Sequence, residues 1–151
     1  MRAAAVGAGA FTAALVLDLL TKTYFVAHAA GPQAVVYNQR PHDLAIRIDV
    51  SLLTLAVVYV LTVVARRRGI GRLWGAWIGV GVLLGGTLGN GVSSYLWARG
   101  VPDFIHVSGG WVWNVADFEI VVGLLGAAVS VVVSAAAAYV RHRLGRLSLQ
   151  E

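Results

Sequence analysis

Long apolar stretches separated by short polar segments dominate this chain. Four of them stand out, at about residues 3–29, 46–65, 73–98 and 117–140. A helix needs roughly 20 apolar residues to cross the ~30 Å hydrocarbon core of a bilayer. The second stretch reaches this length only if it includes residues of the Leu44–Asp49 segment. The side chains of Arg47 and Asp49 would then extend to the membrane–water interface. The pattern predicts an all-α membrane protein with four transmembrane helices.

The segments of about residues 30–49 and 99–116 are the places where the pattern leaves room for non-helical structure. Val35–Tyr37 and the alternating Leu44–Ile48 segment favour short strands that lie on the membrane surface. We see no internal repeat, low-complexity linker or domain boundary. We therefore expect a single integral membrane domain over residues 1–151 with a small extended region.

The first apolar stretch imitates a cleavable signal peptide, because Arg2 precedes it and Ala27–Ala29 reads Ala-His-Ala. However, Asp18 and Lys22 interrupt the apolar run, and the apparent cleavage site falls too far beyond Leu17. We interpret this stretch as a transmembrane helix that stays attached.

Composition supports a membrane protein. Hydrophobic residues make up 58% of the 151 residues, charged residues only 13%, and the mean hydropathy is +0.76. A soluble domain of this size could not bury so much apolar surface in one core. The chain has no cysteine, which excludes a disulfide framework, a thiol nucleophile and a cysteine-ligated metal. We expect no metal and no cofactor.

The basic residues predict the orientation of the helices. Three lie in the two longer connecting segments and one, Lys22, lies within the first stretch. The other eight flank the opposite ends of the apolar stretches: Arg2, Arg66, Arg67, Arg68, Arg72, Arg141, Arg143 and Arg146. Cytoplasmic segments carry the excess of Lys and Arg, so both termini are expected in the cytoplasm. The net charge of +5 follows this pattern and does not predict nucleic-acid binding.

Polar side chains within the apolar stretches are candidates for function, because they are costly in a membrane. Asp18 and Lys22 are four residues apart, so they share one helical face and can form an ion pair. That pair is interpreted equally well as a structural brace for the helix. Asn90 follows the small residues of Gly85–Gly89, which allow helices to approach closely. An interhelical hydrogen bond would also explain Asn90.

Asp103 and Asp117 form the most informative pair. The predicted topology places both carboxylates at the outer membrane surface, on either flank of one loop. Two carboxylates that lie close together cannot both ionise easily, so one keeps a proton while the other acts as a base. Such a dyad can activate a water towards a peptide carbonyl. The spacing alone leaves two other interpretations open, a helix N-cap for Asp117 and a solvated loop residue for Asp103.

Five segments, in chain order, resemble motifs of the lipoprotein signal peptidases, also called signal peptidase II. Asp18–Lys22 is similar to the family's Asp-x-x-(Ser/Thr)-Lys, and Asn38 stands where the family has an asparagine. The other three segments are Gly85–Asn90 for Gly-Gly-Ala-Leu-Gly-Asn, Val101–Ile105 for Val-Val-Asp-Phe-Ile, and Asn114–Asp117 for Asn-x-Ala-Asp. The resemblance extends from the first apolar stretch to the fourth.

The resemblance implies a membrane aspartyl endopeptidase without a metal. It implies cleavage of prolipoprotein signal peptides just before a diacylglyceryl-modified cysteine, at the outer face of the bacterial cytoplasmic membrane. The catalytic aspartates of the family correspond to Asp103 and Asp117. The expected supporting or substrate-binding residues are Asn38, Asn90, Asn114, Asp18 and Lys22. The expected partners are these precursors and membrane lipid, with no nucleic acid, and the protein is expected to be a monomer.

Three departures from the family pattern leave other functions open. Ser93 and Ser94 replace an Asp-Arg pair, residues 39–42 read Gln-Arg-Pro-His, and the loop between the aspartates is short. These changes keep open a non-catalytic relative that binds lipoproteins or their precursors. The intramembrane Asp18 and Lys22 also suggest a small transport or proton-relay protein. That alternative is disfavoured because the acidic residues gather at one membrane surface.

Overall fold

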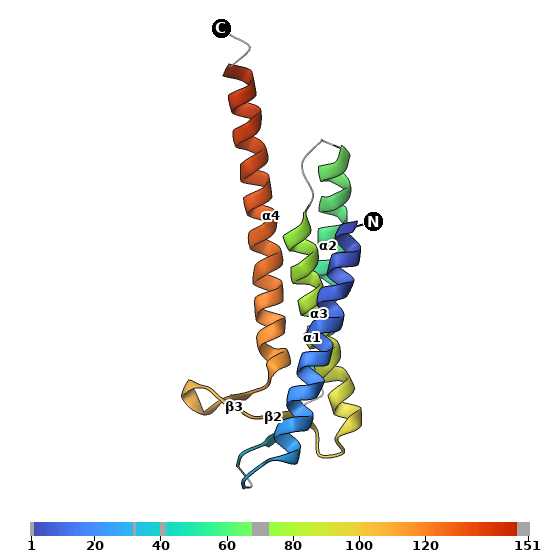
Figure 1. Ribbon diagram of the computed structural model, residues 1–151, viewed down its shortest axis with the longest axis vertical. Helices are drawn as coiled ribbons and strands as arrows, with labels where there is room; N and C mark the ends of the chain where they lie inside the picture. The colour runs from blue at the N-terminus through green and yellow to red at the C-terminus, as the bar shows by residue number, and fades with distance from the viewer. Residues whose placement is uncertain (1, 32, 40–41, 68–72, 148–151) are drawn as a thin grey trace.

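The computed structural model describes residues 2–31, 33–39, 42–67 and 73–147. Within these ranges it contains four long helices (Figure 1): α1 (Arg2–Ala27), α2 (His42–Arg67), α3 (Trp74–Leu96) and α4 (Val115–Leu147). Each contains a segment long and apolar enough to cross a membrane. The predicted all-α class and its four spans are therefore confirmed. Four of the residues used above to predict orientation or departures lie outside the described residues: Arg40, Pro41, Arg68 and Arg72.

Two of the helices extend beyond their predicted limits, whereas α1 and α3 each end two residues before theirs. The second helix begins at His42, well before the predicted start at residue 46, and α4 continues to Leu147, past the predicted end at residue 140. Both extensions contain charged residues, which apolar patterning assigns to the connecting segments. A helix continues through charged residues because its backbone hydrogen bonds do not depend on side-chain polarity.

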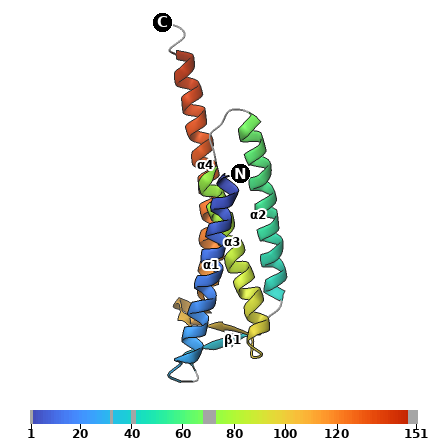
Figure 2. The same cartoon turned by 45° about the vertical axis from the view of Figure 1, so that its right-hand side comes forward.

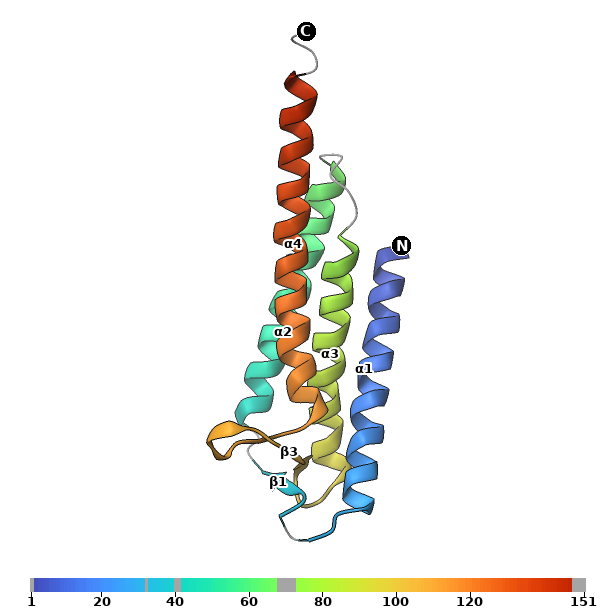
Figure 3. The same cartoon turned by 60° about the vertical axis from the view of Figure 1, so that its left-hand side comes forward.

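The helices pack around α3. Figure 3 shows α3 between α1 and α4, and Figure 2 shows α2 standing apart from α1 along the bundle. Contacts of α3 with α1 and α4 dominate the tertiary structure, and α2 contacts the bundle mainly through α3. Accordingly, α3 is the most buried of the candidate membrane spans, whereas the other three expose most of their apolar side chains. Such exposure suits contact with lipid.

Glycines allow the close approach of α3 to its neighbours. A Cβ atom at Gly123 of α4 would lie 2.4 Å from the backbone nitrogen of Leu83 in α3. At Gly85 of α3 it would lie 2.8 Å from the carbonyl oxygen of Phe11 in α1. Real Cβ atoms do not come this close to backbone atoms, so side chains are excluded at both positions. The small residues of the third span therefore act as the sequence predicted.

Short strands form the end of the molecule opposite to the N-terminus (Figure 1). Within the described residues, β1 (Val36–Asn38) pairs antiparallel with β2 (Val101–Asp103), and β3 (Ile105–His106) pairs antiparallel with β4 (Val112–Trp113). A 3-10 turn, η1 (Ser108–Gly110), connects β3 and β4. The β1–β2 pairing joins the two connecting segments in which the sequence left room for non-helical structure.

One of the two strand predictions is wrong. Val35–Tyr37 does lead into β1, but the Leu44–Ile48 segment belongs to α2. Alternation over only five residues is weak, and this segment runs directly into the long apolar stretch that follows it. A helix satisfies its own backbone hydrogen bonds in a membrane, so extending the spanning helix is more favourable than forming an isolated strand.

Candidate active site

Asp103 and Asp117 are joined through one residue, Asn114. Asp103 is the last residue of β2, and Asp117 lies in the first turn of α4. The side-chain amide of Asn114 donates a hydrogen bond to Oδ1 of Asp103 at 2.6 Å, and its backbone N–H donates to Oδ2 of Asp117 at 3.0 Å. Asp103 is only 5% exposed. The alternative interpretation of Asp103 as a solvated loop residue is therefore wrong.

The start of α4 explains how Asn114 reaches both carboxylates. Asn114 immediately precedes the helix, and its Oδ1 accepts a hydrogen bond from the backbone N–H of Asp117 at 3.2 Å. The Asp117 carboxylate in turn accepts the backbone N–H of Asn114. This reciprocal arrangement is a capping box. The N-cap is thus Asn114, and the alternative interpretation of Asp117 as the N-cap is wrong. The cap uses only Oδ1 of the Asn114 side chain, so its amide nitrogen Nδ2 can donate to Asp103.

Asp117 also accepts hydrogen bonds from two other helices. Asn90 of α3 donates from Nδ2 to Oδ1 at 3.2 Å, and Arg47 of α2 donates from its terminal NH1 nitrogen to the same oxygen at 2.6 Å. The sequence predicted Arg47 at the membrane interface but not its contact with Asp117, which was itself predicted at the outer membrane surface. An arginine beside the apolar stretch of α2 was the sequence signal that could have identified it.

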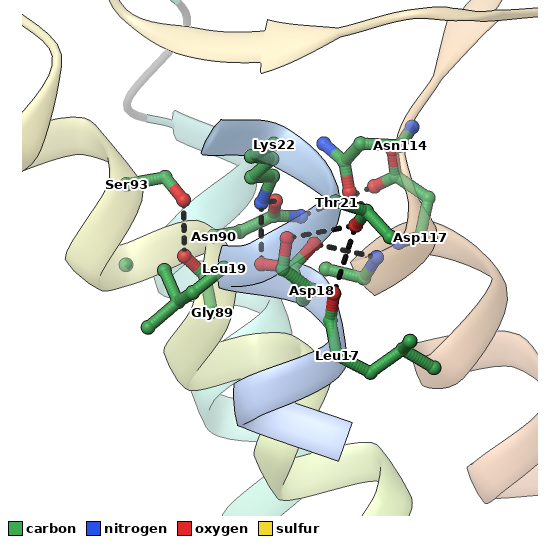
Figure 4. A network of polar contacts seen from close by, with 12 residues as sticks. Leu17, Asp18, Leu19, Thr21, Lys22, Gly89, Asn90, Ser93, Asn114 and Asp117 are labelled. Carbon is green, nitrogen blue, oxygen red and sulfur yellow. Dashed lines mark hydrogen bonds and ion pairs between the residues drawn. The ribbon is translucent and has the colours of Figure 1, made fainter. Parts of the chain in front are cut away.

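The predicted ion pair between Asp18 and Lys22 is confirmed and connects α1 to the site (Figure 4). Lys22 Nζ lies 2.7 Å from Oδ2 of Asp18 and also donates to Oδ1 of Asn90 at 2.8 Å. Oδ1 of Asp18 accepts the backbone N–H of Ala116 at 3.0 Å. Both charged side chains are fully buried. The pair therefore orients Asn90 towards Asp117 and holds the start of α4 against α1.

Burial changes the acidity of Asp103. It raises the pKa of this carboxyl from 3.8 to about 6, and the negative charge of Asp117 acts in the same direction. The hydrogen bond from Asn114 and the positive charges of Lys22 and Arg47 each lower the pKa of Asp103, and each effect is smaller than that of burial. A carboxyl group with this pKa can hold or release a proton near neutral pH, as an acid–base catalyst requires.

Aromatic side chains flank both carboxyl groups. Phe104, the neighbour of Asp103, is buried and stacks on Phe25 of α1 with ring centroids 4.2 Å apart. Phe118, the neighbour of Asp117, makes an edge contact with Trp113 of β4 at 5.0 Å. These ring contacts attach the segment after β2 to α1, and β4 to α4.

The remaining predicted positions lie beside this network. Asn38 is half-buried at the end of β1, where it pairs in register with Val101, two residues from Asp103. Ser93 donates a hydrogen bond to the carbonyl of Gly89 at 2.6 Å, and Ser94 donates to that of Gly91 at 2.7 Å. Both serines thus bond to their own helix. A role of Asn38 in substrate binding stays a prediction.

Glu119 was not singled out from the sequence. It lies two residues after Asp117, is buried, and both of its carboxyl oxygens lack a hydrogen-bond partner among the described residues. A Cβ at Gly86 of α3 would lie 2.8 Å from Cβ of Glu119, so this face of α4 lies directly against α3. A single acidic residue in an apolar stretch was the only sequence signal for it.

Comparison with known proteins identifies the family. Residues 10–133 match the family model described as Signal peptidase (SPase) II. This chain belongs to the signal peptidase II family. The match covers all four helices at least in part, and it includes every residue of the hydrogen-bond network around Asp103 and Asp117. The resemblance drawn from the five motifs is therefore confirmed.

Two curated relatives are lipoprotein signal peptidases. The one from Methylobacterium radiotolerans is 44% identical over 64 residues, which are 40% of this chain and 36% of the relative. The one from Methylorubrum extorquens is 40% identical over 77 residues, which are 48% of this chain and 43% of the relative. The chain thus spans less than half the length of either signal peptidase II relative. No solved structure matches it.

Proposed function

We propose that this protein is an aspartyl endopeptidase that removes signal peptides from diacylglyceryl-modified prolipoproteins. The observation that carries the proposal is the contact of Asn114 with both Asp103 and Asp117 at one end of a membrane-type bundle. Membership of the signal peptidase II family supports the substrate class. The excess of basic residues at the other end of the bundle supports an active site at the outer face of the bacterial cytoplasmic membrane.

The dyad acts by general acid–base catalysis. One carboxylate takes a proton from a water molecule, whose oxygen forms a bond to the carbonyl carbon of the scissile peptide. The tetrahedral intermediate then collapses, the carbon–nitrogen bond breaks, and the other carboxyl group gives its proton to the leaving amine. In this scheme Asn114 holds the two carboxyl groups at a fixed separation, and Asn90 orients Asp117. Asp18 and Lys22 brace the site from α1.

An apolar cavity suits the lipid part of the substrate. It has a volume of about 250 Å³ and lies among α1, α2 and α3, with Phe11, Leu52 and Leu84 in its lining. Ser51 also lines it, and the Ser51 hydroxyl donates to the carbonyl of Arg47 at 2.7 Å. The cavity therefore begins one helical turn from the residue that contacts Asp117. We propose that it accepts an acyl chain of the diacylglyceryl group.

Cleavage of a diacylglyceryl prolipoprotein in proteoliposomes tests the proposal, with mass spectrometry of the product. We expect the wild type to cut just before the lipidated cysteine, and both Asp103→Asn and Asp117→Asn to abolish cleavage. Asp49→Asn is the matched control, because Asp49 is an exposed acidic residue of α2, and it should cleave normally. Cleavage that survives in either dyad variant would refute the mechanism.

A second candidate function is a non-catalytic relative that binds prolipoproteins. Ser93 and Ser94 favour it, because they bond to their own helix where the family pattern has a charged pair. Folded wild type that captures the precursor in a pull-down, without any product on several precursors, would favour this candidate over the peptidase.

A further inference from the structure

We propose that Arg47 divides the roles within the dyad, so that Asp117 is the base and Asp103 carries the proton that the leaving amine receives. This inference rests on the proposed peptidase function and adds Arg47 to it as a positioning residue. Arg47 reaches the site from α2, a helix that supplies none of the residues expected from the sequence.

The hydrogen bonds of Asp117 all favour its ionised form. Oδ1 accepts a charge-assisted bond from Arg47 and a second bond from Asn90, and Oδ2 accepts the backbone N–H of Asn114. A carboxylate that accepts several N–H groups and faces a cation within bonding distance is stabilised relative to the protonated acid. Asp117 thus has the environment suited to the carboxylate that accepts the proton of the water.

Asp103 has a different environment. Its Oδ1 accepts one bond from the neutral amide of Asn114, and both salt bridges among the described residues belong to other carboxylates. The side chain is buried, and burial raises its pKa to about 6. Of the two carboxyl groups, Asp103 therefore retains a proton more readily, and it is the one able to protonate an amine.

Arg47 is the cation that makes this difference. Lys22, the other cation in the site, lies 2.7 Å from Asp18, so its charge is already compensated. Among the described residues, Arg47 has Asp117 as its only ion-pair partner. The charged groups that face Asp117 from the elements around it are therefore Arg47 from α2, the Asp18–Lys22 pair from α1 and Asp103 from β2.

The backbone of α2 is held in place at this turn. Ser51 donates to the carbonyl of Arg47 at 2.7 Å, and its oxygen lies 2.8 Å from the hydroxyl oxygen of Thr87 in α3. Both hydroxyl groups are buried. This link attaches the turn of α2 that carries Arg47 to α3, the helix that carries Asn90. Arg47 and Asn90, which both donate to Oδ1 of Asp117, are therefore held in fixed positions relative to each other.

The pH dependence of kcat/KM tests the assignment in an active wild type. In Arg47→Gln the acidic limb of the profile should move to higher pH, with a loss of about tenfold or more near pH 5 and a smaller loss near pH 8, because a nearby opposite charge favours the ionised base. Arg47→Lys keeps the positive charge, so its acidic limb should lie close to that of the wild type. Arg99→Gln is the control, since Arg99 lies over the ring of Tyr37 in β1. An unmoved acidic limb in Arg47→Gln would overturn the proposal.

Infrared titration of the carboxyl groups provides a second measurement that requires no substrate. Near pH 5, the protonated-carboxyl band of the dyad should disappear in Asp103→Asn and remain in Asp117→Asn. In the Arg47→Gln background part of the band should remain after either substitution, because without the cation either carboxyl group can hold a proton. A band that is lost in Asp117→Asn and kept in Asp103→Asn would refute the inference. Absence of cleavage by the wild type would instead refute the peptidase function, and the infrared result would still decide where the proton lies.

Discussion

Asn114 donates its side-chain amide to Asp103 and its backbone N–H to Asp117, at 2.6 and 3.0 Å. One residue therefore sets the separation of the two proposed catalytic groups while it caps the helix that carries one of them. The two tasks can be separated by substitution, because a cap needs only a short polar side chain whereas the contact with Asp103 needs the amide.

Replacing Asn114 tests this separation. In Asn114→Ala we expect the cleavage rate to fall by roughly tenfold to a hundredfold and the protein to lose about 1 kcal/mol of stability, because a hydrogen bond to a carboxyl group and a helix cap are both lost. Asn114→Ser should keep most of the stability and still cleave slowly. Cleavage rates and thermal unfolding in detergent measure the two effects. Equal rates in Asn114→Ser and wild type would contradict the proposed role of the amide.

The buried ion pair of Asp18 and Lys22 predicts strong coupling between these residues. Lys22→Met should destabilise the protein by roughly 3–5 kcal/mol, because it leaves a carboxylate without its partner inside the bundle. Adding Asp18→Asn to this variant should recover part of the loss. A double-mutant cycle of thermal unfolding measures the coupling. Losses that simply add in the double variant would show that the pair does not act as a unit.

The raised pKa of Asp103 predicts that stability falls as pH rises. Because the pKa in the folded protein is about 6 rather than 3.8, the folded state binds this proton more tightly than the unfolded chain does. The resulting stabilisation is complete below pH 3.8 and is lost as pH rises through about 6. The melting temperature of the wild type should therefore drop between about pH 4 and pH 7 by more than that of Asp103→Asn. Parallel pH profiles for the two proteins would count against the raised pKa.

Close packing of α3 on α4 predicts opposite outcomes at two glycines of the same helix. Gly123→Ala should destabilise the protein by roughly 1–3 kcal/mol, because its Cβ would lie 2.4 Å from the backbone nitrogen of Leu83. A Cβ at Gly126 meets no atom of the described residues within 4 Å, so Gly126→Ala should be neutral or stabilising through its higher helix propensity. Thermal unfolding of both variants in detergent measures the difference. Similar melting temperatures would contradict the observed packing.

The carboxyl group of Glu119, which has no hydrogen-bond partner within the described part of the chain, predicts a tolerant position. Glu119→Gln keeps the size of the side chain but cannot carry a charge, so it should leave stability unchanged or increase it. Glu119→Ala leaves a cavity against Gly86 and should be less stable than Glu119→Gln. Melting temperatures of the two variants provide the test. A marked loss of stability in Glu119→Gln would mean that the carboxylate itself has a partner essential to the fold.

Much of the fold followed from the sequence because the membrane imposes simple rules. Apolar runs of bilayer length predicted all four spans, and the i, i+4 spacing of Asp18 and Lys22 predicted their ion pair. These features depend on local periodicity and on length alone. The same rules failed for the Leu44–Ile48 segment, where a short alternation competed with a helix that continues from the adjacent span.

The candidate dyad was also found from the sequence, since Asp103 and Asp117 flank one loop at one predicted membrane surface. Their mutual arrangement was not. Asn114 acquires its bridging position only when β2 pairs with β1 and α4 docks on α3, and Arg47 reaches Asp117 across 70 residues of chain. Hydrogen bonds between distant segments depend on how helices rotate and pack, which no local pattern encodes. The sequence by itself therefore determined the spans, the Asp18–Lys22 pair and the candidate carboxylates, and the tertiary structure alone decided which donors each carboxylate receives.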